Sequence, residues 1–291
     1  MKTNSTQQET ACIFSTNNYP FASSKTKSVR FFRTAFCLLV LLLASATLVE
    51  AQTKTWDGQA GTSNWNDANN LNPNGVPSSS DAVILITSSS NGVNVVVNTS
   101  NAVCASLQLG GTSASTAGRI TFASTGSPKL TVSGTVTVGG SGSTNNNRRG
   151  EITFVNGATL EANQIVLTRS TAGNDNPGII TMSAGSTLIT GSFVVGQGTT
   201  TWTPSTGTVI LKSDNTLPST VFNTFHNLTF LEGTTTAPGT LTINGDLTIG
   251  SDGGFNGAAF THNIAGDWIN NGGTFTSTGI VNMNGGTQVI G

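Results

Sequence analysis

The sequence predicts an all-β protein and, within that class, a right-handed parallel β-helix (a solenoid of stacked strand coils) with an N-terminal cap. After Gln52, no window carries apolar residues at helical spacing over three turns. Short runs in which apolar residues alternate with Thr, Ser or Asn recur between Gly and Asn turns. Such runs also suit a β-sandwich, which is the runner-up. Internal repetition favours the solenoid, because stacked coils must place like residues over like.

The clearest repeat joins residues 150–167 (GEITFVNGATLEANQIVL) to residues 178–195 (GIITMSAGSTLITGSFVV), at a spacing of 28 (178 − 150 = 28). At this spacing Ile152 falls over Ile180. Three further pairs of like segments continue the pattern: 118–122 with 150–154, 243–247 with 264–268, and 207–211 with 279–283. Steps near 20 and 28 residues fit coils whose loops vary in length, and parallel crossovers are almost always right-handed.

Residues 1–51 predict a secretory signal peptide with a long polar lead. A basic flank ends at Arg33, and the apolar run 35–49 is 15 residues long, too short to cross a bilayer comfortably. Cleavage after Ala51 would leave Gln52 as the new N-terminus. We therefore expect a secreted product, extracellular or on the outer cell surface, with no membrane span after signal cleavage. An uncleaved N-terminal anchor is the alternative.

Residues 52–100 are expected to form the N-terminal cap and the first coils. An open solenoid end exposes backbone donors and an apolar core, so a distinct cap is required. This segment is rich in Trp and Pro and shows little alternation. Trp56 and Trp65 are expected to plug the first coil. A sugar-stacking role is the alternative, and together with Trp202 they are the candidate residues for contact with glycans.

Residues 101–291 are expected to form the β-solenoid repeats. The chain stops within strand-like sequence, so we expect a downstream region of its own polypeptide as a partner. The strands expected from Asp81 onward are 83–86, 93–97, 106–109, 119–122, 130–132, 135–138, 152–154, 165–167, 179–182, 193–195, 209–211, 228–230, 241–243, 247–249 and 280–283.

Charge and cysteine content exclude two classes of protein. After Gln52 there are seven basic and eleven acidic residues, a net charge of −4 (7 − 11 = −4), and the only adjacent basic pair is Arg148-Arg149. Nucleic-acid binding therefore has no electrostatic footprint. Cys104 is the only cysteine after the signal, so no internal disulfide framework exists, and we expect it to be buried as a small hydrophobe.

No constellation of residues predicts a catalytic, cofactor or metal site. The 21-residue step stacks Asp246 and Asp267, for which turn capping is the ordinary reading and general acid–base catalysis the alternative. His226 and His262 are too few for a zinc site. Residues 173–178 (GNDNPG) are rich in oxygen ligands but lack the acidic alternation of a calcium loop.

Thr residues offer one more possibility. Stacked hydroxyls on one flat solenoid face could order water, which makes ice binding an alternative function. Outward Thr is equally what a soluble strand prefers. The residues considered for such a face are Thr135, Thr137, Thr153, Thr181, Thr240 and Thr242.

Several phrases together resemble a known family. Residues 56–71 (WDGQAGTSNWNDANNL) and 75–85 (GVPSSSDAVIL) resemble the start of large secreted bacterial cell-surface β-solenoid proteins of the adhesin and autotransporter-passenger kind. Residues 266–272 (GDWINNG) resemble that family's repeats, with Asp267 in place of Asn. The resemblance covers nearly all of residues 55–291 and implies an adhesin-like surface protein. Many members carry a C-terminal sorting or anchoring domain.

These observations favour a non-enzymatic, adhesin-like β-solenoid scaffold that is secreted or held at the cell surface. Its outer faces and loops would contact glycans or other cell-surface components. The alternatives are a carbohydrate-active β-helix enzyme of the polysaccharide lyase or hydrolase kind, a glycan-binding module, and an ice-binding solenoid.

Overall fold

The computed structural model describes residues 50–86, 93–111, 117–140, 149–168, 178–196 and 200–291. These residues form one compact unit of β-strands. The described residues contain one short 3-10 turn, η1 (Ala68–Asn70), and no α-helix. The strands lie in three sheets, and every strand pair except β1–β2 is parallel. The all-β prediction is therefore confirmed, with parallel pairing as its dominant pattern.

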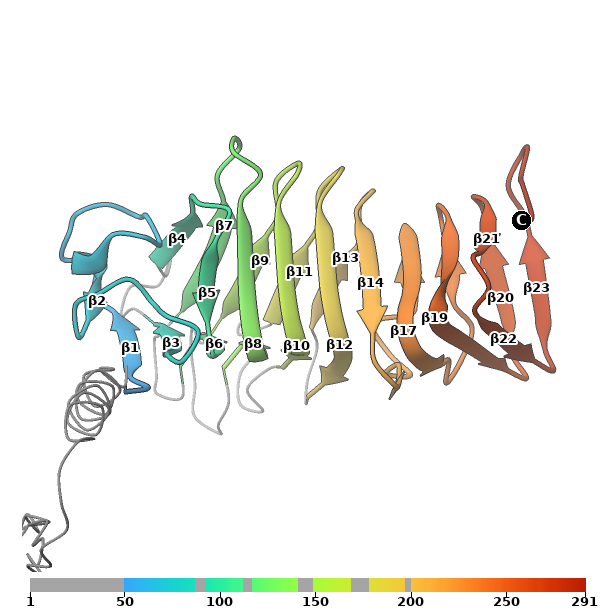
Figure 1. Ribbon diagram of the computed structural model, residues 1–291, viewed down its shortest axis with the longest axis horizontal. Coiled ribbons are helices and arrows are strands. Elements are labelled where there is room, and N and C mark those ends of the chain that lie inside the picture. The colour runs from blue at the N-terminus through green and yellow to red at the C-terminus, as the bar shows by residue number, and fades with distance from the viewer. Residues whose placement is uncertain (1–49, 87–92, 112–116, 141–148, 169–177, 197–199) are drawn as a thin grey trace, which may run out of the picture. The chain divides into compact units, whose positions relative to one another are not determined.

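The long sheet has 14 strands and carries the strand order β2-β1-β3-β6-β8-β10-β12-β14-β17-β19-β21. After the antiparallel β1–β2 pair, this path follows the chain order without a reversal, which Figure 1 shows as an unbroken run of colour from blue to red. Its strands are β1 (Thr53–Trp56), β2 (Leu71–Asn72), β3 (Ala82–Leu85), β6 (Ser106–Leu109), β8 (Lys129–Val138), β10 (Thr159–Leu167), β12 (Thr187–Val195), β14 (Thr208–Lys212), β17 (Asn227–Thr236), β19 (Leu247–Ala258) and β21 (Trp268–Asn270), with β5 (Ala102–Cys104), β15 (Asn215–Thr216) and β22 (Thr274–Ser277) beside this path.

The other strands form two smaller sheets, and along the chain they alternate with strands of the long sheet. From β7 to β14 the chain alternates between the long sheet and a five-stranded sheet, and from β16 onward it visits a four-stranded sheet instead. The five-stranded sheet holds β4 (Val93–Val97), β7 (Gly118–Phe122), β9 (Gly150–Thr153), β11 (Gly178–Thr181) and β13 (Thr201–Thr203). The four-stranded sheet holds β16 (Thr224–Phe225), β18 (Thr242–Ile243), β20 (Thr261–Ile264) and β23 (Ile280–Met283).

The strand registers confirm most of the repeats predicted from the sequence. Residues 28 apart are partners, as Leu160 with Leu188 in β10 and β12. Gly118 pairs with Gly150, and Ile243 pairs with Ile264. Residues 207–211 and 279–283 are alike in sequence, but they are not paired in register. β14 belongs to the long sheet and β23 to the four-stranded sheet, so this predicted repeat was wrong.

Like residues over like build the core. One column of the long sheet runs through Leu130, Leu160, Leu188, Val209, Leu228 and Leu247, each at most 1% exposed. Alternate residues point outward, as the buried–half-buried alternation of β10 and β14 shows. Burying one such side chain stabilises the folded protein by about 1.5–3 kcal/mol relative to leaving it exposed. Because each side chain in the column is covered by the strands on either side, every strand depends on its two neighbours for this stabilisation.

A column of glycines marks the start of three strands in the five-stranded sheet. Gly118, Gly150 and Gly178 are register partners. A Cβ at Gly150 would overlap the backbone of Gly139 and Leu109, where the long sheet and the five-stranded sheet meet. None of the three needs a left-handed backbone, so the requirement for glycine is steric: two backbones approach too closely for any side chain.

The first segment of the unit differs from the rest. β1 pairs antiparallel with β2 and parallel with β3, so it joins the cap-like segment to the long sheet. Trp56 and Trp65 are only 3% and 1% exposed, and the Trp65 amide donates to the Val96 carbonyl at 2.9 Å. Both indoles therefore pack into the core at this end of the sheets.

Candidate functional surfaces

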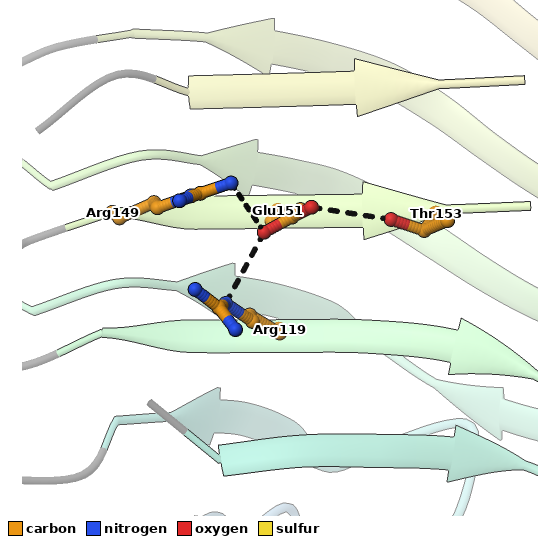
Figure 2. A network of polar contacts seen from close by, with 4 residues as sticks. All are labelled: Arg119, Arg149, Glu151 and Thr153. Atoms are coloured by element: carbon orange, nitrogen blue, oxygen red, sulfur yellow. Dashed lines mark hydrogen bonds and ion pairs between the residues drawn. The ribbon is translucent and has the colours of Figure 1, made fainter. Parts of the chain in front are cut away.

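An ion-pair cluster lies on the outer face of the five-stranded sheet. Glu151 of β9 faces Arg119 of β7, with 3.1 Å between Arg119 Nε and Glu151 Oε2, and Arg149 Nη2 approaches the same oxygen at 2.8 Å. Figure 2 shows the two guanidinium groups converging on this carboxylate, Arg119 from the adjacent strand β7 and Arg149 from the residue that precedes β9. The Thr153 hydroxyl donates to the other oxygen at 3.3 Å. Neither arginine aligns well enough to give Glu151 Oε2 a hydrogen bond, so the cluster is held mainly by charge.

A ladder of threonines runs beside this cluster. Thr121, Thr153, Thr181 and Thr203 are successive register partners across β7, β9, β11 and β13. The five-stranded sheet thus presents a column of hydroxyls next to the charged pair Arg119–Glu151. Thr153 connects the two, since its hydroxyl donates to Glu151.

The predicted flat threonine face does not form as expected. Thr135 and Thr137 lie in β8 of the long sheet, Thr153 and Thr181 in the five-stranded sheet, and Thr242 in the four-stranded sheet. Of the candidate pairs, only Thr153 and Thr181 stack on each other. The expectation of one common face was wrong because the sequence pattern does not reveal which sheet a strand joins. Ice binding itself stays a prediction.

A second charged group spans the long sheet. Glu161 of β10 accepts Lys129 Nζ of β8 at 2.8 Å and Lys212 Nζ of β14 at 2.5 Å, so the second lysine reaches across β12. These two hydrogen bonds from lysine, first Lys129 and then Lys212, hold the pKa of Glu161 below its usual value, against the opposing effect of partial burial. One carboxylate thus bridges two lysines.

The predicted aspartate pair lies in a ladder of side-chain acceptors. Asn227 Oδ1 accepts the Asp246 amide at 2.9 Å, Asp246 Oδ1 accepts the Asp267 amide at 2.8 Å, and Asp267 Oδ1 accepts the Val289 amide at 2.8 Å. The predicted stacking at 21 residues is confirmed. Each carboxylate holds the backbone of the next strand return, which is the arrangement of a turn cap.

The three candidate tryptophans occupy two environments. Stacking on a sugar requires an exposed ring face, and Trp56 and Trp65 are buried. Trp202 of β13 is half-buried; its indole nitrogen donates to the Thr224 carbonyl at 2.8 Å, and its ring packs against Phe222 with 5.1 Å between ring centroids. Trp202 is therefore the one of the three that is only partly buried, although its ring packs against the core.

His262 and Cys104 are both buried in the core. His262 is fully buried: its Nδ1 accepts the Leu241 amide at 3.2 Å and its Nε2 lies 2.8 Å from the Gly257 carbonyl, which assigns the proton to Nε2. Cys104 is buried, as expected. Burial, aided by the negative charge of Asp81, raises the pKa of its thiol to about 12. Neither residue meets solvent.

The strands β21, β22 and β23 form an uncovered apolar end. Inward positions of the four-stranded sheet are fully buried at Phe225, Ile243 and Ile264, whereas the next position in that column, Met283, is only half-buried. A pocket of about 270 Å³ opens there, lined by Trp268, Phe275, Val281, Met283 and Ile290. Residues 289–291 pair with β21, but within the described residues no further strand covers β23 and this pocket.

Sequence reasoning missed one contact group, formed by Asp81, Ser78 and Gln52. The sequence alone assigns Asp81 no role, although Ser78 and Asp81 have the spacing of a side-chain-capped turn. Gln52 lies 29 residues earlier, and nothing in the sequence pairs the two.

The described residues contain neither a metal-binding cluster nor a membrane-spanning helix. Within these residues, no group of three or more His, Cys, Asp or Glu side chains is placed to hold a metal ion. No helix in the same part of the chain has the length and hydrophobicity needed to cross a bilayer. Residues 173–177 of the oxygen-rich loop lie outside the described ranges.

Comparison of the chain with protein-family models, with curated proteins and with solved structures found no match.

Proposed function

We propose that residues 52–291 form a right-handed parallel β-helix with an N-terminal cap, and that this solenoid is a non-enzymatic, adhesin-like scaffold exported to the cell surface. The observation that carries the proposal is the unbroken parallel pairing of the long sheet from β3 to β21, in which like residues lie over like. Hairpin-linked sandwich strands would pair antiparallel. The right hand follows from the general preference of parallel crossovers.

The outer faces support a binding rather than a catalytic role. Their charges are paired on the sheets, as at Glu151 and Glu161, and the stacked aspartates are used as turn caps. One outward column consists of hydroxyls, at Thr121, Thr153, Thr181 and Thr203, which suits repeated hydrogen bonding to glycans. The half-buried Trp202 ring at the edge of the five-stranded sheet is the aromatic contact we propose for a sugar.

The uncovered end supports a further part of the proposal. Strands of the same polypeptide would continue the core over β23, because the inward column of the four-stranded sheet runs on to Met283 and Ile290 borders the same pocket. The local register advances by 19 residues from β20 to β23, as in Asn263 and Asn282, so one further strand return of similar length would cover the pocket.

Export and surface display can be tested in intact cells that produce the full chain. We expect an antibody against residues 52–291 to label unpermeabilised cells, and added protease to remove that signal. The matched control is Leu42→Arg, which interrupts the apolar run and should keep the product inside. Labelling that requires permeabilisation in both cases would contradict the proposal. Adherence of producing cells to a glycan array, lost with Trp202→Ala, would identify the contact.

A further inference from the structure

Asp81 holds the backbone nitrogen at which the expected mature chain begins. The amide of Gln52 donates to Asp81 Oδ1 at 3.0 Å, while the amide and hydroxyl of Ser78 both donate to Oδ2 at 2.8 Å. Asp81 is only 3% exposed. Burial alone would raise the pKa of its carboxyl, but the hydrogen bonds from Ser78 and Gln52 and the charge of Lys54 outweigh burial and lower it. A buried anion therefore lies next to the Gln52 nitrogen.

The chain on the other side of this nitrogen is open. Glu50 and Ala51 are exposed and belong to no strand, whereas β1 begins at Thr53. The Gln52 carbonyl accepts the Ala82 amide at 2.8 Å. The fold thus grips the backbone from Gln52 onward and leaves the preceding peptide bond accessible.

We propose that Asp81 is the docking site for the α-ammonium group of Gln52 that cleavage after Ala51 creates, and that this docking protects the new N-terminal glutamine from cyclisation. The inference rests on the proposed export. After cleavage, a neutral amide donor becomes a cation at the same position. A hydrogen bond to a buried carboxylate then becomes a charge-paired one, which is the stronger kind.

The protection follows from the chemistry of cyclisation. The neutral amine attacks Cδ of its own side-chain amide; the N–Cδ bond forms, the Cδ–Nε2 bond breaks, and Nε2 leaves with a proton as ammonia. Only the unprotonated amine has the required lone pair, and a docked ammonium has none. The side chain is held as well, because Lys54 Nζ lies 3.4 Å from Gln52 Oε1.

The charged and titratable groups around this nitrogen are few. Lys54 is 4% exposed, and its Nζ also donates to the Pro73 carbonyl at 3.2 Å. The Cys104 thiol lies near Asp81 and is neutral at physiological pH, since its pKa is raised to about 12. Asp81 is therefore the anion that the new ammonium group meets.

The test uses the full chain, secreted by its own signal and analysed by mass spectrometry of the N-terminal peptide. We expect the product to begin at Gln52 and to lose ammonia slowly at pH 7. A rise of one unit in the amine pKa lowers its neutral fraction about tenfold, so Asp81→Asn should lose ammonia about tenfold faster. Asp57→Asn, which removes an exposed carboxylate of the same segment, is the matched control and should behave as the wild type.

A second measurement needs no variant, in case Asp81→Asn loosens the fold. The pH at which the α-amine becomes reactive toward an acylating reagent is compared for the folded protein and for the protein in urea, and we expect the higher value in the folded protein. A product that begins elsewhere than at Gln52 would overturn both the docking and the export boundary. A start at Gln52 with equal rates and equal reactivity would overturn the docking alone and leave export intact.

Discussion

At the scale of single residues, the strictest requirement on the sequence is for glycine where two sheets meet. The glycine column Gly118–Gly150–Gly178 sits where the long and five-stranded sheets approach backbone to backbone. A methyl group there has no flexible neighbour to displace, because the overlapping atoms are main-chain atoms. Close packing makes such an overlap costly.

Gly150→Ala should therefore lower the free energy of unfolding by about 2 kcal/mol or more, measured by urea denaturation of the purified protein. Gly239→Ala is the matched control, since a Cβ at Gly239 meets no atom within 4 Å. That control should be neutral or slightly stabilising, because alanine restricts the unfolded chain. Equal effects at the two positions would show that the close approach of the sheets does not constrain the fold.

Glu161 gives a second prediction at this scale, in the form of a pH dependence. Because its folded pKa lies below the usual value of about 4.3, the carboxylate stabilises the fold above that pH and the contribution is lost as the pH falls through the folded pKa. Lys129 is 38% exposed, so water and salt screen the pair, and we expect Glu161→Gln to cost at most about 1 kcal/mol.

The comparison is urea unfolding of wild type and Glu161→Gln at pH 7 and pH 3, in low and high salt. The difference between the two proteins should shrink at pH 3 and in high salt. Glu232→Gln, at an exposed position of β17, serves as the control for removing a negative charge. A difference that is the same at both pH values would contradict the role of the ionised carboxylate.

At the scale of elements, the strands differ in how many neighbours they have. β10 pairs with β8 and β12, whereas β23 pairs only with β20 within the described residues. A strand with an unpaired edge and exposed apolar side chains is a template for association. Ile280 of β23 is 64% exposed and Ile290 is 73% exposed, so the uncovered end combines both properties.

Ile280→Lys should reduce self-association of the purified protein with little change in stability, since Ile280 contributes little buried surface. Light scattering coupled to size exclusion, across a range of protein concentrations, measures the effect. Val76→Lys places the same charge at a 48% exposed position near the other end and should leave association unchanged. If both variants reduced association equally, general charge rather than the β23 edge would be responsible.

The elements also show what the sequence can predict and why. Strands with strict alternation, such as β9 and β11, were placed correctly because each carries its own periodic signal and a like neighbour 28 residues away. The second half of β19 was missed. It reads Gly-Ser-Asp-Gly-Gly-Phe, which carries no alternation, and it pairs only because β17 and β22 supply partners on both sides. Contacts at irregular spacing, such as Gln52 with Asp81, leave no repeat to detect.

At the scale of the whole molecule, stability is shared between neighbours along the stack rather than concentrated in one centre. Each strand from β3 to β19 on the main path of the long sheet pairs with the strand before it and the strand after it, and one buried column runs from β8 to β19. In such arrays the stability of a segment depends on its own packing and on its two interfaces. The ends therefore have fewer stabilising interfaces than the middle.

Hydrogen–deuterium exchange should follow this gradient, with amides of β10, β12 and β14 the slowest and those of β21 and β23 among the fastest to exchange. The four-stranded sheet offers an internal comparison: β18 has a neighbour on each side, and β23 lies at the edge with its inward residues Val281 and Met283 half-buried. Amides of β23 should exchange at least tenfold faster than those of β18, which corresponds to about 1.4 kcal/mol of opening free energy. Equal protection of β18 and β23 would mean that the molecule opens as one cooperative unit with no weak end. It would also contradict the proposal that β23 is an open edge to which further strands are added.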